Sequence, residues 1–123
     1  MTGTRVMGIA GVLMATGIVV GALAAHALQR VLEERQLESL HTAVNYQLFN
    51  ALGLLLIGVL MRDAAFASLR PVAWLLIAGI VAFSGGIYLM LAGAPRPLGF
   101  VTPLGGVALI AAWTWFAVSV WRR

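Results

Sequence analysis

The chain has 123 residues, of which 62% are hydrophobic and 10% are charged, whereas soluble domains have about 45–50% apolar and about 25% charged residues. This composition excludes an ordinary soluble domain and indicates that lipid surrounds most of the folded surface. The formal charge is +4, but the arginines are scattered between apolar runs, which excludes the continuous basic face of a nucleic-acid binder.

Four long runs without charged residues follow one another along the chain. A bilayer core about 30 Å thick needs about 20 apolar residues in a helix, and each run is long enough. We therefore predict an all-α fold with one domain, residues 1–123, formed by a bundle of four transmembrane helices. The predicted spans are approximately 6–25, 42–61, 71–94 and 103–121.

Small residues recur in the first span, where Gly17, Gly21 and Ala25 are spaced by four and share one helical face. In lipid, small residues at this spacing let two helix backbones approach closely. Two interpretations remain open: a contact inside the bundle, or a contact between copies of the chain. The pairs Gly85-Gly86 and Gly105-Gly106 predict further close crossings or local unwinding in the third and fourth spans.

The longest segment predicted outside the membrane joins the first two spans. Its apolar residues Leu28, Val31 and Leu32 recur at helical spacing among Glu, Gln and Arg residues. This pattern predicts a short amphipathic helix at the membrane surface, approximately residues 28–41, which runs into the second span.

The second span opens with an unusual polar cluster, which includes Tyr46, Gln47 and Asn50 within about 100° around the helix. In hydrocarbon such groups need partners, so we expect them to face the bundle interior. They either form interhelical hydrogen bonds, typically worth about 0.6 kcal/mol each, or line a polar pocket for a head group, quinone or small solute. The full candidate pocket comprises His26, His41, Asn45, Tyr46, Gln47, Asn50, Ser84, Tyr88 and Thr102.

No metal site or cofactor is expected. His26 and His41 border the same loop and could bind a divalent cation with Glu34 or Glu38, but zinc usually takes three or four closely spaced ligands. The predicted spans hold no Asp, Glu, Lys or Arg in their interiors, whereas ion pumps and coupled carriers usually place ionisable groups there. The common acid, base and nucleophile pairs of catalysis are missing as well. We therefore do not expect an enzyme.

The distribution of arginines predicts the orientation. With four spans, both termini and the second loop share one side, which holds five arginines against three on the other. Because cytoplasmic loops carry an excess of basic residues, we expect a multi-pass protein of the bacterial inner membrane with both termini in the cytoplasm.

Four short motifs resemble those of a known family, in order along nearly the whole chain: GALAAHAL at 21–28, TAVNYQ at 42–47, FSGGIYL at 83–89 and TPLGG at 102–106. They resemble the bacterial domain-of-unknown-function 423 family, which is similar to eukaryotic transmembrane protein 256. The resemblance implies a four-span inner-membrane protein and no particular reaction. It also implies a departure, because Asn50 stands where the family's second span has a histidine.

The leading functional hypothesis is a non-enzymatic structural, assembly or accessory protein. Its expected partners are the lipid bilayer and either further copies of the chain or another membrane protein, with no nucleic acid. The alternative is a binder or carrier of a lipid, quinone or small solute through the polar pocket on the second span. A histidine- or metal-dependent membrane enzyme ranks last.

Overall fold

The computed structural model describes residues 1–123 as four long helices and three 3-10 turns. The helices are α1 (Gly3–Ala25), α2 (Glu34–Leu60), α3 (Arg70–Leu91) and α4 (Val101–Trp121). The turns are η1 (Leu28–Arg30), η2 (Ala64–Leu69) and η3 (Arg96–Phe100). All four helical segments are long and apolar enough to cross a membrane, so the predicted all-α membrane bundle is confirmed.

The helix boundaries have local causes. The Thr2 hydroxyl accepts a hydrogen bond from the backbone N–H of Arg5 and caps α1. The Glu33 and Gln36 side chains form a capping box at the start of α2. Gly93 follows α3 with a φ of 95°, a conformation that glycine adopts without steric cost.

The segment predicted as an amphipathic helix over 28–41 forms in two pieces. Residues Leu28–Arg30 make the 3-10 turn η1, and the helix that begins at Glu34 continues without a break to Leu60. The capping box at Glu33 fixes this start, and no glycine or proline interrupts the helix where the predicted second span begins. Residues 34–41 are therefore the first turns of α2.

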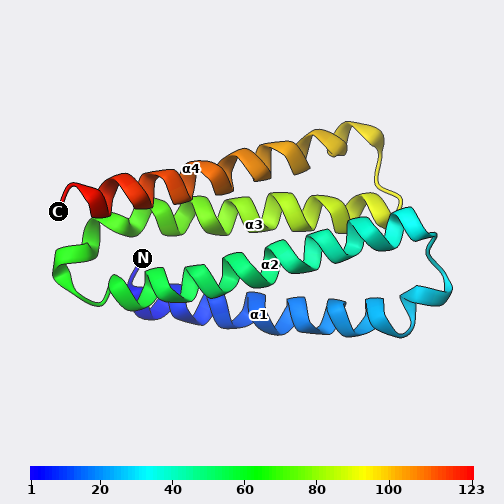
Figure 1. Ribbon diagram of the computed structural model, residues 1–123, viewed down its shortest axis with the longest axis horizontal. Helices are drawn as coiled ribbons and strands as arrows, with labels where there is room; N and C mark the ends of the chain where they lie inside the picture. The colour runs from blue at the N-terminus through cyan, green and yellow to red at the C-terminus, as the bar shows by residue number, and fades with distance from the viewer.

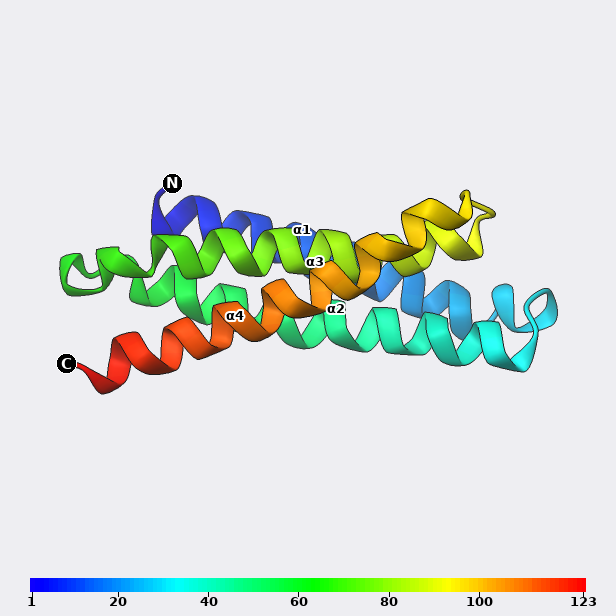
Figure 2. The ribbon, with the colours of Figure 1, turned by 90° about the horizontal axis from the view of Figure 1, so that it is seen from above.

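The helices lie in a row in the order α1, α2, α3, α4 (Figure 1). The central helices are the more enclosed: buried residues make up 44% and 39% of the apolar windows in the spans containing α2 and α3, against 17% in those containing α1 and α4. Figure 2 shows α4 crossing α3 obliquely, with its C-terminal half diverging. Both termini and η2 lie at one end, and η1 and η3 lie at the other (Figure 1).

The hydrophobic core occupies the half of the bundle nearer the termini. Leu54 and Ile57 of α2 pack there against Leu76 of α3 and Val6 of α1. These side chains are at most 1% exposed. The polar residues of α2 precede this core in the chain, so they lie in the middle of the bundle and toward its η1 end.

Candidate functional site

Gln47 is the centre of a hydrogen-bonded network that joins three helices. Its side-chain Nε2 donates to the Leu13 carbonyl and to the Thr16 hydroxyl of α1, each at 2.9 Å. Its Oε1 accepts from the Tyr88 hydroxyl of α3 at 2.6 Å. Only 4% of Gln47 is exposed, so these partners replace the water that the amide would otherwise bind. We call Gln47 and these partners the Gln47 network.

Two further bonds add a second link from α3 to α2 and connect α4 to α2. The Ser84 hydroxyl of α3 donates to the Ala43 carbonyl at 2.7 Å. The Trp113 indole N–H of α4 donates to Asn50 Oδ1 at 2.8 Å, while Asn50 Nδ2 donates to the Tyr46 carbonyl within α2. Every buried side-chain nitrogen and oxygen has a hydrogen-bond partner. Four of the predicted residues, Gln47, Asn50, Ser84 and Tyr88, therefore form the interhelical bonds that were one of the two interpretations.

The other candidate residues lie apart from this network. His26, His41 and Asn45 are exposed. Tyr46 is 46% exposed, and its ring stacks on that of Phe83 with 4.7 Å between centroids. No group of three or more His, Cys, Asp or Glu residues lies close enough to hold a metal ion.

Three partners in these hydrogen bonds were not among the predicted pocket residues: the Leu13 carbonyl, Thr16 and Trp113. Thr16 offered one signal in the sequence, since it is a hydroxyl inside an otherwise apolar span. Its own hydroxyl donates to the Val12 carbonyl at 2.9 Å, which leaves its oxygen oriented to accept from Gln47. The Leu13 carbonyl could not be predicted as a partner, because every residue has a backbone carbonyl.

The small face of α1 packs against α2 inside the bundle. A Cβ added to Gly17 would lie 2.7 Å from a methyl carbon of Leu48, and one added to Gly21 would lie 3.3 Å from Val44. Ala25, at the end of the same face, is exposed. Two of the three predicted positions therefore serve an intramolecular contact.

The two glycines of each later pair, Gly85-Gly86 and Gly105-Gly106, have different surroundings. Gly86 faces Thr102 of α4, and Gly105 faces the backbone of α3, so both allow α3 and α4 to cross closely. Gly106 lies beside an aromatic ring of α3 at ordinary contact distance, and Gly85 faces open space. Both helices are continuous through these residues, so the glycines mark a crossing and no unwinding.

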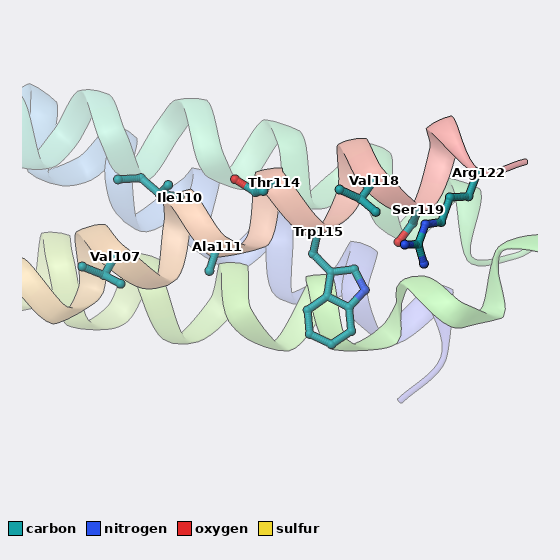
Figure 3. A pocket seen from close by; sticks show the side chains of 8 residues that line it. All are labelled: Val107, Ile110, Ala111, Thr114, Trp115, Val118, Ser119 and Arg122. Atoms are coloured by element: carbon teal, nitrogen blue, oxygen red, sulfur yellow. The ribbon is translucent and has the colours of Figure 1, made fainter.

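A shallow hollow of about 640 Å³ runs along the outer face of α4 (Figure 3). Seven of the eight lining residues come from α4 and the eighth, Arg122, directly follows it; the eight are Val107, Ile110, Ala111, Thr114, Trp115, Val118, Ser119 and Arg122. Because no second helix closes it, this surface is the outer edge of the row.

Comparisons with known proteins agree with this architecture. The family model described as "Protein of unknown function (DUF423)" matches residues 20–106. The UPF0382 membrane protein YwdK of Bacillus subtilis is 36% identical over 93% of this chain and 92% of its own length. The UPF0382 membrane protein SH2409 of Staphylococcus haemolyticus is 36% identical over 83% of each chain, and a Haemophilus influenzae relative is 34% identical over 78% of this chain and 77% of its own.

No solved structure matches the chain. The relatives align over most of their own length and are named as membrane proteins, and the family model covers the bonded second span and the crossing of α3 and α4. The chain is thus an integral membrane protein that belongs to the DUF423 family.

Proposed function

We propose that this protein is a non-enzymatic assembly protein of the bacterial inner membrane, which associates through the outer face of α1 with a second copy of itself. The observation that carries the proposal is a row of small residues on that face, defined by Gly8, Gly11 and Ala15. A Cβ added to Gly8 or Gly11 would meet nothing within 4 Å, and Ala15 is exposed.

These residues recur at intervals of three and four, which places them on one side of a helix. Glycine inside a helix costs about 0.5–1 kcal/mol relative to alanine, and nothing within the chain offsets that cost at Gly8 and Gly11. Small residues at such spacing allow close packing of a neighbouring helix in lipid. The intramolecular contact uses the other side of α1, through Gly17 and Gly21, so the outer face is free for a partner.

The polar site supports a structural role more than a binding or catalytic one. A solute or quinone that hydrogen-bonded to Gln47 would displace at least one of its bonds to Leu13, Thr16 and Tyr88. Each displaced group would then need a new partner in hydrocarbon. Gln47 and Asn50 of α2 therefore act as connectors between helices.

Native mass spectrometry of the protein extracted in mild detergent tests this proposal. We expect masses of two or more chains, and we expect Gly11→Leu to raise the dissociation constant at least about tenfold, or about 1.4 kcal/mol, by separating the facing backbones. Gly85→Leu is the matched control, because Gly85 is also a helical glycine that faces open space.

A single-chain mass for the unaltered protein would contradict self-association. Equal effects of Gly11→Leu and Gly85→Leu would show that the outer face of α1 is not the contact. A different protein retained at fixed stoichiometry, and lost only with Gly11→Leu, would make the chain an accessory subunit of that protein instead.

A further inference from the structure

A second hollow lies at the η1 end of the bundle, where residues near the C-terminal ends of α1 and α3 line the same cavity. It has a volume of about 350 Å³ and is lined by eight residues, all of them hydrophobic. Leu23 of α1 and Leu91 of α3 form its sides, and Leu40 of α2 lines it from the third helix. Leu28 and Leu32 contribute from the segment between α1 and α2, so this connecting segment lines the hollow at the η1 end of the bundle.

The same segment presents polar groups beside these leucines. His26, Gln29 and Arg30 line a shallow neighbouring hollow of about 630 Å³. All three residues are exposed. Leu28 directly precedes Gln29 in the chain. The turn η1 therefore contributes Leu28 to the apolar hollow and the hydrogen-bond donors Gln29 and Arg30 to the polar one.

We propose that these adjoining hollows bind one glycerophospholipid of the leaflet on the η1 side. One acyl chain occupies the apolar hollow between α1 and α3, and the phosphate lies against Arg30, with Gln29 as a second donor. This site is separate from the outer face of α1, so it goes beyond the assembly role proposed above.

The chemistry of the apolar hollow favours a hydrocarbon chain over water or a polar solute. Buried water needs two to four polar partners, and apolar cavities stay dry. Tyr88 is the one lining residue with a polar side-chain atom, and its hydroxyl already donates to Gln47. In a bilayer the most abundant apolar group that could fill this hollow is the acyl chain of a phospholipid.

The charge of Arg30, on the same connecting segment, favours a phosphate. Arginine binds phosphate oxygens with strong, charge-assisted hydrogen bonds, and basic residues near a membrane surface are attracted to lipid head groups. Arg30 lies in η1, within two residues of Leu28 and Leu32. The acyl chain and the head group of one lipid can therefore be bound by a single short segment of the protein.

Native mass spectrometry of the delipidated full-length protein, titrated with dioleoyl phosphatidylglycerol, tests the site. We expect one lipid per chain to bind most tightly. Val20→Phe, which adds bulk to the lining of the hollow, should weaken this binding about tenfold or more. Leu104→Phe is its control, because Leu104 is 67% exposed on the outside of α4. Arg30→Gln should also weaken binding about tenfold, and Arg96→Gln, an exposed arginine at the same end, should not.

Circular dichroism melting checks that Val20→Phe keeps the fold of the unaltered protein, and Arg30→Gln tests the site at an exposed position where misfolding is not at issue. The proposal is overturned if either variant binds the lipid as well as its control. It is also overturned if the protein, before delipidation, retains a quinone in place of a phospholipid. The number of chains appears in the same spectra, so failure of the lipid site is distinguishable from failure of self-association.

Discussion

At the scale of single residues, the amide of Gln47 shows how a polar group is accommodated inside an apolar bundle. Both of its N–H groups and its oxygen have partners, drawn from α1 and α3. In hydrocarbon an unsatisfied group costs several kcal/mol, so this arrangement holds only when the helices are assembled. The Gln47 network therefore couples the positions of three helices to one side chain.

Gln47→Leu should lower the free energy of unfolding by about 2 kcal/mol, because it removes three bonds of about 0.6 kcal/mol each. Unfolding in mixed micelles by titration with sodium dodecyl sulfate measures the change. Asn45→Leu is the control, since Asn45 is exposed two residues away in the same helix, and it should change the free energy by less than about 0.5 kcal/mol. Equal losses in the two variants would contradict the role of the network.

The residue types at this site could be predicted from the sequence, but their pairing could not. Polar residues in an apolar span must find partners, so Gln47, Asn50, Ser84 and Tyr88 stand out. Their partners depend on the rotation and depth of the neighbouring helices, which residue spacing within one helix does not define. Asn50 illustrates the difference: its side chain meets Trp113, 63 residues later in the chain.

At the scale of the helices, the crossing of α3 and α4 depends on glycines whose surroundings differ sharply. A Cβ on Gly105 would meet backbone atoms of Phe83 and Ala82, which cannot move without moving α3. The nearest atom to a Cβ on Gly106 would lie 3.6 Å away, in the Phe83 ring. A side chain at position 105 would therefore clash with α3, whereas a methyl group at position 106 would fit, although the two glycines are adjacent in the sequence.

Gly105→Ala should lower the free energy of unfolding by about 1–3 kcal/mol, the usual cost of inserting an extra group into a packed interface. Gly106→Ala should leave stability unchanged or raise it by up to about 1 kcal/mol, because alanine favours the helix. The same detergent titration measures both variants. Similar stabilities for the two would show that α3 and α4 do not cross closely at Gly105.

The boundaries of the helices were predictable to the extent that local chemistry sets them. The capping box of Glu33 and Gln36 lies in the sequence and fixes the start of α2. The amphipathic pattern over 28–41 is compatible with both a separate surface helix and the first turns of α2. Hydrophobic spacing defines which face of a helix is apolar, whereas caps and breaks define where the helix ends.

At the scale of the whole molecule, the arrangement in a row leaves α1 and α4 as opposite edges (Figure 1). The number of spans and their order along the chain follow from hydropathy. The choice of a row over a closed bundle depends on contacts between helices, since each helix has apolar residues on several sides and lipid covers those faces as readily as another helix does. The outer faces of α1 and α4 are consequently available for lipid or for partners.

The orientation of this row is a prediction that the absence of cysteines makes simple to test. With both termini in the cytoplasm, a single cysteine at exposed Gln29 in η1 should react with a membrane-impermeant maleimide in intact cells. One at exposed Ala67 in η2 should react only after the membrane is broken. The reverse pattern would place the termini outside the cytoplasm.

The same assay tests whether arginines set the orientation. The end of the bundle with the termini carries five arginines and the η1 end carries three, so Arg122→Ser with Arg123→Ser leaves three at each end. Because the bias of basic residues decides which loops stay in the cytoplasm, this double variant should insert in both orientations, and both cysteines should label in part in intact cells. If labelling stays confined to Gln29→Cys, the C-terminal arginines do not determine topology.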